Sequence, residues 1–311
     1  MNTSDRIARL RDALQDEGLD AILVSSQENR HYLSGFTGSA GYLLVSHEQA
    51  VLATDFRYVE QARGQAVDFR VLKDSGKGHW LKKTLEQTAV NRVGFEAQDL
   101  TVSAHSALTK ALGHPETQNG IELVETQDLL DKIRVTKSSE ELGHMARAIE
   151  ITDLAFEEVS HSIRPGITEK NVAWQLEKAM RERGAEAPAF DTIVASGPNG
   201  AMPHHAPCDK VLEHGEPVVV DMGARYEGYC ADLSRTVVVG GSGDEKFWRI
   251  YETVLRAQLN AEDEIKSGMT GAEIDAISRN VIALAGYKEN FGHSLGHGVG
   301  LAVHELPHVS P

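Results

Sequence analysis

The chain has 311 residues, 41% of them hydrophobic, and a formal net charge of −15 at pH 7. This length predicts two domains, and the acidic balance argues against a nucleic-acid-binding protein, which would need a basic surface. The chain has only two cysteines, Cys208 and Cys230, which predicts reduced thiols rather than disulfides. Its amino terminus lacks an apolar leader, and its apolar runs are far too short to cross a bilayer. We therefore expect a cytoplasmic protein without a membrane segment.

The first 127 residues alternate between helical and strand patterns. Apolar residues at helical spacing predict helices, and short β-branched runs predict strands. The predicted helices span residues 4–17, 57–65, 79–88 and 101–113, and the predicted strands span 21–26, 42–46, 50–55, 69–72, 92–97 and 121–126. This alternation is typical of an α/β domain with a mixed sheet, which we assign to residues 1–127.

Residues 128–311 begin with a long helical pattern and then contain an internal repeat. SIRPGIT at 162–168 resembles EIKSGMT at 264–270, which lies 102 residues further on. Each copy lies between two helical stretches, and each ends in a threonine that can cap the second helix. The repeat predicts a second domain built of two similar α/β halves, with a site where the halves meet.

A β-hairpin with two aspartates follows the first pair of helices. Residues 217–225 and 229–239 read as strands around a turn at 226–228, and the strands carry Asp221 and Asp232. A buried aspartate is costly unless its charge is compensated, and a divalent cation would compensate both carboxylates. The alternative is that one aspartate caps a turn and the other faces solvent.

Histidines gather in two short windows. GHSLGHGVGLAVHE at 292–305 contains His293, His297 and His304, and His204 and His205 lie just before the aspartate hairpin. One imidazole could complete a metal site with the aspartates, and the others could hold substrate or move protons near neutral pH. Taken singly, each could instead be an ordinary loop or core histidine.

These segments resemble one family along essentially the whole chain. HSLGHGVGLAVHE is similar to the histidine signature of the proline-specific metallopeptidases, the aminopeptidase P and prolidase family. DMGARYEGYCADLSRT resembles its paired-aspartate hairpin, and ASGPNGAMPHH resembles the segment with its first substrate histidine. NRHYLSGFTGSAGYLLV and TDFRYVEQA resemble the amino-terminal domain of the same enzymes.

The resemblance implies a duplicated α/β domain of the pita-bread type at residues 128–311 and two divalent ions, with Mn²⁺ expected and Co²⁺ or Zn²⁺ as alternatives. It implies metal ligation by Asp221, Asp232 and His297, with Asp232 bridging the ions. A hydroxide shared by the ions would attack the bond before proline. His204 and His304 would contact substrate and assist proton transfer, and His293 would bind the tetrahedral intermediate. The implied partners are proline-containing peptides and, in a homodimer, a second copy of the chain.

The sequence departs from the family pattern in one respect. The two glutamates that complete the family's metal site match no segment here, and the repeat offset would place the counterpart of the aspartate hairpin beyond Pro311. We therefore expect a second half that is incomplete at its carboxyl end and a 311-residue chain with weak activity or none. Two alternatives stay open: an enzyme like methionine aminopeptidase, and an inactive pita-bread binding module. His205 and Glu305 are interpreted as structural.

Overall fold

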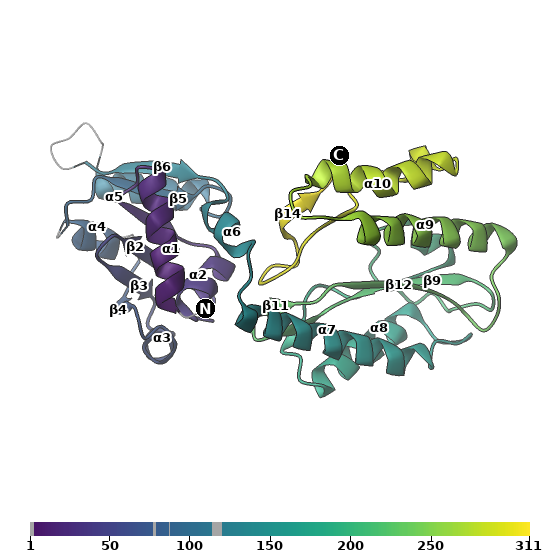
Figure 1. Ribbon diagram of the computed structural model, residues 1–311. Coiled ribbons are helices and arrows are strands. Elements are labelled where there is room, and N and C mark those ends of the chain that lie inside the picture. Colours follow the sequence, from purple (N-terminus) through teal and green to yellow (C-terminus); the bar gives the residue numbers. More distant parts are fainter. Residues whose placement is uncertain (1–2, 77–78, 87, 114–119) are drawn as a thin grey trace. The chain divides into compact units, whose positions relative to one another are not determined.

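The computed structural model describes residues 3–76, 79–86, 88–113 and 120–311, and the chain divides into two compact units, Met1–Ser138 and Ser139–Pro311 (Figure 1). The first unit extends past the segment 1–127 because it includes helix α6 (Leu129–Arg134). Leu130, Ile133 and Arg134 of this helix are buried. The described helices lack the combination of length and apolar character that a membrane crossing requires.

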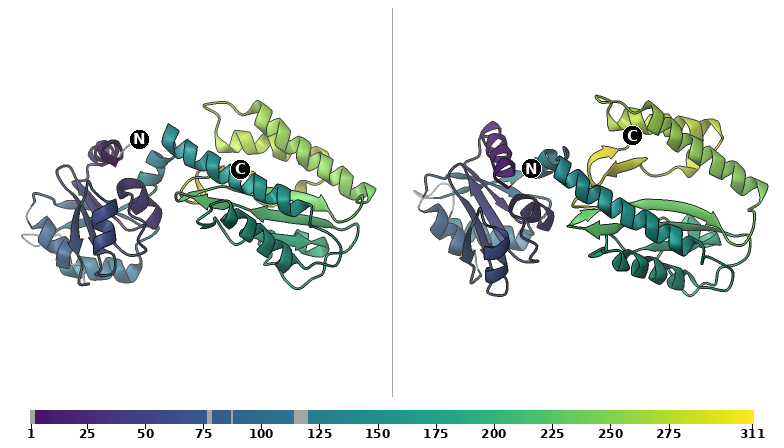
Figure 2. Two further views of the ribbon diagram at one scale, coloured as in Figure 1. Left: turned by 90° about the horizontal axis from the view of Figure 1, so that it is seen from below. Right: turned by 60° about the horizontal axis from the view of Figure 1, so that its bottom comes forward.

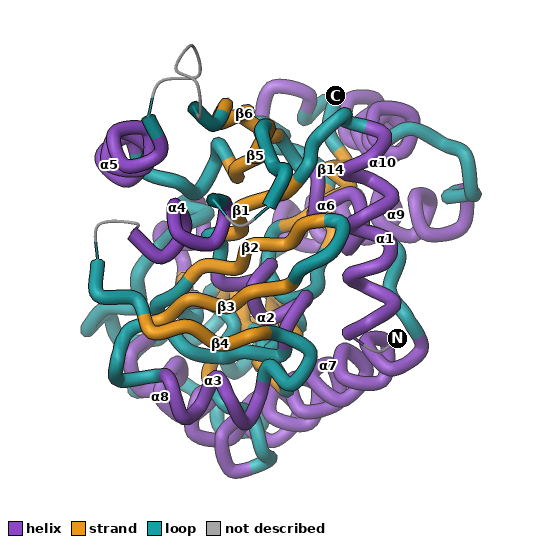
Figure 3. The backbone as a smooth tube through the Cα atoms, turned by 90° about the vertical axis from the view of Figure 1, so that its left-hand side faces the viewer, coloured by secondary structure: helices purple, strands orange, loops and turns teal. Residues whose placement is uncertain are grey.

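The first unit is one mixed sheet with helices on both faces (Figure 3). Strands β1–β2 and β2–β3 pair antiparallel, whereas β1–β5, β3–β4 and β5–β6 pair parallel, in the order β4-β3-β2-β1-β5-β6. The strands are β1 (Ala21–Val24), β2 (Tyr42–Ser46), β3 (Ala50–Thr54), β4 (Arg70–Lys73), β5 (Arg92–Glu96) and β6 (Glu122–Thr126). The helices are α1 (Thr3–Asp16), α2 (Gln27–Ser34), α3 (Val59–Gln65), α4 (His79–Leu85), α5 (Val102–Leu112) and α6. The predicted mixed sheet is confirmed; residue 87 of the predicted helix 79–88 lies outside the described residues.

Helix α2 is an element that apolar periodicity did not predict. Its sequence, QENRHYLS, is mostly polar, so the usual helical pattern is absent. Its ends carry the signals instead: the Ser26 side chain accepts a hydrogen bond from Asn29 N, and Gly35 closes the helix at φ 71°. Capping at both ends compensates for the weak pattern in so short a helix.

The second unit contains two helix pairs and three small sheets. The helices are α7 (Ser139–Ser160), α8 (Glu169–Glu182), α9 (Glu245–Glu264) and α10 (Gly271–Leu284), with short 3₁₀ turns η1 (Gly197–Ala201) and η2 (Lys288–Asn290). The strands are β7 (Ala187–Pro188), β8 (Ile193–Ser196), β9 (Pro217–Met222), β10 (Ala224–Tyr226), β11 (Tyr229–Cys230), β12 (Leu233–Val238), β13 (Gly296–Gly298) and β14 (Glu305–Val309). They form three small sheets, ordered β12-β9-β8, β11-β10-β7 and β13-β14.

The internal repeat corresponds to the two helix pairs, which lie on opposite sides of the β12-β9-β8 sheet (Figures 1 and 2). Helices α8 and α10 have 14 residues each and begin after Thr168 and Thr270, whose side chains accept from the backbone three residues on. The turns before these helices contain Gly166 at φ +94° and Gly268 at φ +93°, a conformation that favours glycine. The predicted duplicated α/β architecture is confirmed.

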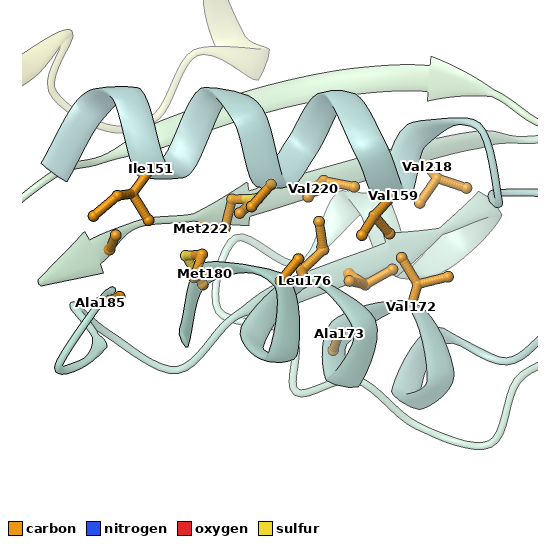
Figure 4. Close-up of a cluster of buried hydrophobic side chains, with 14 of the residues drawn as sticks. Ile151, Val159, Val172, Ala173, Leu176, Met180, Ala185, Val218, Val220 and Met222 are labelled. Atoms are coloured by element: carbon orange, nitrogen blue, oxygen red, sulfur yellow. The ribbon is translucent and has the colours of Figure 1, made fainter. Parts of the chain in front are cut away.

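The core of the second unit lies between β9 and the α7–α8 pair (Figure 4). Val218, Val220 and Met222 of β9 are buried against residues such as Ile151 of α7 and Leu176 of α8. The residues between them in β9 therefore point to the opposite face of the sheet, because side chains alternate along a strand.

The aspartate hairpin differs from the prediction of two continuous strands. Its register is continuous, from Tyr226↔Tyr229 at the turn to Asp221↔Ser234, but the pairing is divided between two sheets at Gly223. A Cβ at Gly223 would meet Ala231 O at 1.8 Å. Only a residue without a Cβ fits against Ala231 O there, and one sheet ends where the other begins.

Candidate metal centre

Two aspartates lie on the sheet face that points away from the α7–α8 core. Asp221 is the register partner of Ser234, and Ser234 Oγ donates a hydrogen bond to Asp221 Oδ1 at 2.8 Å. Asp232 lies two residues before Ser234, at the break between β11 and β12, so it falls on the same face. The hairpin thus brings both carboxylates together from its two arms.

The pKa of Asp221 reflects its closeness to Asp232 and His297. Burial raises the pKa of Asp221; the Ser234 hydrogen bond lowers it, Asp232 raises it again, and His297 lowers it. The net direction is upward, because a second negative charge and partial burial both disfavour the ionised carboxyl. A cation between the two carboxylates would reverse that preference.

His297 brings an imidazole to this pair. Its Nδ1 lies 3.0 Å from Gly298 O, and because a carbonyl can only accept, Nδ1 carries a proton; in the neutral ring the Nε2 lone pair is then available. His297 Nε2 lies 3.5 Å from Asp232 Oδ2, and each side chain keeps 24% of its surface exposed. A metal-binding histidine typically donates its other ring N–H to a backbone carbonyl in this way.

His304 lies beside His297. The two ring centroids are 4.2 Å apart with 56° between the planes. His304 is exposed. The structure therefore joins four of the residues singled out in the sequence: Asp221, Asp232, His297 and His304.

Backbone contacts tie the histidine segment to the aspartate hairpin. Cys230 N donates to Gly300 O at 2.7 Å, two residues before Asp232. A Cβ at Gly300 would meet Glu305 Oε1 at 2.2 Å, and one at Gly298 would meet Leu306 O at 2.2 Å. Glycine at these two positions lets β13 and the residues after it lie close to β14, and the Cys230 bond joins this segment to the hairpin.

His293 lies on a segment held by helix α10. Arg279 donates to the carbonyl oxygens of Phe291 and His293 at 2.9 Å each, and it forms a two-point ion pair with Asp275, at 2.6 and 2.9 Å. Asp275 also accepts from Leu295 N at 3.0 Å. The Arg279 hydrogen bonds, and then the Leu295 bond, hold the pKa of Asp275 below its usual value against the effect of burial.

The remaining predicted site residues do not meet the aspartates directly. Within the described part of the chain, no hydrogen bond, ion pair or ring contact joins His204 or His293 to Asp221, Asp232 or His297. The His293 ring donates from Nδ1 to Ser294 O at 2.6 Å. His204 is exposed, and its neighbour His205 instead contacts Glu169.

Side-chain spacing tests whether the paired aspartates and His297 suit a metal. Two ligands of one cation lie about 3.0–3.4 Å apart when metal–ligand bonds are about 2.1 Å long. The 3.5 Å between His297 Nε2 and Asp232 Oδ2 agrees with that spacing, and carboxylate oxygens with an imidazole nitrogen are a suitable donor set. The residues therefore fit divalent cations.

A second group of possible ligands fits poorly. Among the described residues, one ligand atom each from Glu169, His205 and Cys208 lie within 4.8 Å of one another. Glu169 Oε2 and His205 Nε2, however, are 2.7 Å apart, which is a hydrogen-bond distance and too short for two ligands of one ion. A site for two ions spreads its ligands further, because the ions themselves lie about 3.5–4 Å apart.

Sequence reasoning missed several residues that support the centre. Ser234 could have been found, because continuing the register from the turn places it opposite Asp221. Asp275 and Arg279 carried a weaker signal, an acid and a base four residues apart on a predicted helix. The Cys230–Gly300 hydrogen bond had none, since it joins backbone groups far apart in the chain.

Comparison with known proteins agrees with this architecture. Residues 143–311 match the model of metallopeptidase family M24, and residues 6–136 match that of the creatinase/prolidase N-terminal domain. A solved Xaa-Pro dipeptidase from Bacillus anthracis is 41% identical, with a TM-score of 0.93 over 99% of this chain and 85% of that one. A solved X-Pro aminopeptidase from Thermotoga maritima is 38% identical, with a TM-score of 0.88 over 98% of this chain and 84% of that one.

A curated relative gives the same result at the level of sequence. The Xaa-Pro dipeptidase of Pyrococcus horikoshii is 38% identical over 309 residues, 99% of this chain and 84% of its own. A creatinase-type domain followed by a duplicated domain with paired aspartates and a histidine defines a class of metallopeptidases. The chain belongs to metallopeptidase family M24, and its second unit has the pita-bread fold.

Proposed function

We propose that this metallopeptidase hydrolyses the peptide bond before proline, with Asp221, Asp232 and His297 holding two divalent cations, Mn²⁺ first among them. The observation that carries the proposal is the meeting of the two carboxylates with an imidazole whose free Nε2 lies 3.5 Å from Asp232 Oδ2. When bound, such ions polarise a carbonyl and lower the pKa of water, which supplies a nucleophile at neutral pH.

The protein's own groups would orient the reaction. The Nδ1–H of His297 donates to Gly298 O, which fixes the ring and directs Nε2 toward Asp232. His304, 4.2 Å from the His297 ring and exposed, is suited to contact substrate and to take up or return a proton. His204 and His293 are exposed. Both are assigned to substrate binding, and His293 to the tetrahedral intermediate.

The proposed specificity for proline rests on the activities for which the relatives are named. Two of them are named for Xaa-Pro dipeptidase activity and one for X-Pro aminopeptidase activity. The match to the creatinase/prolidase N-terminal domain also favours this branch over an enzyme like methionine aminopeptidase. A homodimer in the cytoplasm remains our prediction from the sequence.

The test compares substrates. The protein, expressed from its complete gene and loaded with Mn²⁺ or Co²⁺, would be given Xaa-Pro dipeptides, longer Xaa-Pro peptides and methionyl-alanyl peptides. We expect cleavage before proline that a chelator stops, and the faster of the first two substrates separates a dipeptidase from an aminopeptidase. Faster cleavage of methionyl-alanyl peptides, or cleavage that survives the chelator, would contradict the proposal.

A further inference from the structure

A buried carboxylate outside the candidate metal centre organises one of the exposed histidine loops. Glu169 is the first residue of α8 and is fully buried. The mechanism above does not use it. An isolated buried charge is strongly unfavourable, so its surroundings must compensate it.

One oxygen of Glu169 binds the start of the loop between β8 and β9. Its Oε1 accepts hydrogen bonds from Ser196 N and Ser196 Oγ at 2.7 Å each and from Asn199 Nδ2 at 2.9 Å. Ser196 ends β8, and Asn199 lies in the 3₁₀ turn η1. The carboxylate thus fixes the point where the chain leaves the sheet.

The other oxygen binds the far side of the same loop. Oε2 accepts from His205 Nε2 at 2.7 Å and from Cys208 N and Cys208 Sγ at 3.2 Å each. Donors surround both oxygens, so the ionised carboxylate, which only accepts, matches its environment. Three such bonds to each oxygen make this a stronger anchor than a single hydrogen bond could be.

His204 lies between these two anchored positions. Residues 201–204 are exposed, so packing gives this stretch little support. Two local backbone hydrogen bonds define its shape: Met202 N donates to Asn199 O, and His205 N donates to Met202 O. Glu169 holds the outer residues of this pair of bonds, Asn199 and His205. Loss of the Glu169 hydrogen bonds would therefore free both ends of the stretch that carries His204.

We propose that Glu169 is a positioning residue whose carboxylate, through Ser196, Asn199, His205 and Cys208, holds His204 where the substrate binds. This rests on the role of His204 in the proposed function. The second half of the unit has a comparable arrangement, because Asp275 on α10 is buried and, with Arg279, holds the segment that carries His293. In each half, a buried carboxylate on the second helix fixes an exposed histidine loop.

The central experiment is a double-mutant cycle on peptide cleavage. Glu169→Gln keeps the shape but replaces an acceptor with a donor that faces other donors. It should lower kcat/KM about 10–100-fold, as misplacing a substrate-contacting group does. In a His204→Ala background the same change should cost less than about threefold, because the effect passes through His204. Equal fold-losses in both backgrounds, or no loss in either, would overturn the proposal.

Two controls separate positioning from general destabilisation. Glu182→Gln makes the same substitution at an exposed position on the same helix and should leave kcat/KM and the melting temperature unchanged. Asn199→Ala removes one link and leaves Glu169 its other donors, so it serves if Glu169→Gln does not fold. It should give a smaller loss that also disappears in the His204→Ala background; an additive loss would count against the proposal.

Hydrogen exchange tests the anchor without relying on peptidase activity. Amide exchange across residues 197–206 should speed up in Glu169→Gln and stay unchanged in Glu182→Gln. If the unmodified protein cleaved no Xaa-Pro peptide, the proposed function would fail while this measurement still reported on the loop. Unchanged exchange in Glu169→Gln would overturn the anchoring role, whatever the activity.

Discussion

Three histidines of the second unit differ in the ring nitrogen that makes a hydrogen bond or in the partner that accepts it. His297 donates Nδ1 to a carbonyl and leaves Nε2 free toward Asp232, whereas His205 gives its Nε2 proton to the Glu169 carboxylate. His293 donates Nδ1 to Ser294 O. Family resemblance assigned His204 to substrate and His205 to a structural role, but the sequence could not show what His205 contacts, because its partner is a glutamate 36 residues earlier in the chain.

The contacts of Arg279 lead to a prediction about the stability of the protein. Its planar fork binds Asp275 at two points and also two carbonyl oxygens, which a lysine ammonium cannot reproduce. Arg279→Lys should lower the free energy of unfolding by about 1–3 kcal/mol, because the buried Asp275 loses part of its compensation. Urea unfolding measures this.

Arg147→Lys is the matched control. Arg147 pairs with Glu150 at the surface, also on a helix, and donates to Arg183 O. Its replacement should change stability by no more than about 0.5 kcal/mol. Equal effects of the two substitutions would contradict the anchoring role of Arg279.

At the scale of elements, the sequence predicted what regular patterns encode. The strands of the first unit and the paired helices around the repeat follow hydrophobic periodicity and capping residues, and they form where expected. Helix α2 and the division of the aspartate hairpin do not follow periodicity. The first depends on caps at Ser26 and Gly35. The second occurs where Gly223 lies close to Ala231 O, a contact that only the three-dimensional arrangement reveals.

The close contact at Gly223 leads to a prediction about the stability of the hairpin. Gly223→Ala should lower the free energy of unfolding by at least about 2 kcal/mol, because its Cβ would lie 1.8 Å from Ala231 O and the hairpin would have to shift. By contrast, Gly143 lies inside α7 with open space around it. Gly143→Ala should raise the free energy of unfolding by about 0.5–1 kcal/mol. The same sign for both in urea unfolding would contradict this account of the break.

At the scale of the whole molecule, the site needs both halves of the second unit. The first half supplies the aspartates on β9 and before β12, and the second supplies His297 on β13 and His304 before β14. Family resemblance could group these residues in advance. The backbone bond from Cys230 to Gly300 that joins the halves could not be predicted, because backbone groups leave no signature in the sequence.

Two buried carboxylates predict how stability changes with pH. Burial alone would raise the pKa of Glu169, but hydrogen bonds from Asn199, His205 and Ser196 outweigh it and lower the pKa; Arg279 lowers that of Asp275. Each group binds its proton more weakly in the folded state than in the unfolded chain. Its stabilising contribution is therefore present above the unfolded pKa, about 4, and is lost as pH falls toward the lower folded value.

Asp275→Asn removes one of these groups. The variant should be less stable than wild type at pH 7, and the difference should shrink as the pH falls from about 5 to 3, in the window set by the unfolded carboxyl pKa. Urea unfolding at several pH values measures it, with Glu182→Gln expected to follow wild type. A difference between Asp275→Asn and wild type that stays constant with pH would show that the Asp275 charge does not contribute.

Metal content tests the central claim, that Asp221, Asp232 and His297 hold the metal of this peptidase. Wild type, Asp232→Asn and Asp209→Asn, expressed from the complete gene, would be incubated with Mn²⁺, separated from free metal and measured by mass spectrometry. Asp209 is an exposed partner of Lys170 and serves as the matched control. We predict that wild type and Asp209→Asn retain manganese and Asp232→Asn loses it, with cleavage of Xaa-Pro peptides falling at least about 1,000-fold. Wild-type metal content and activity in Asp232→Asn would contradict the account.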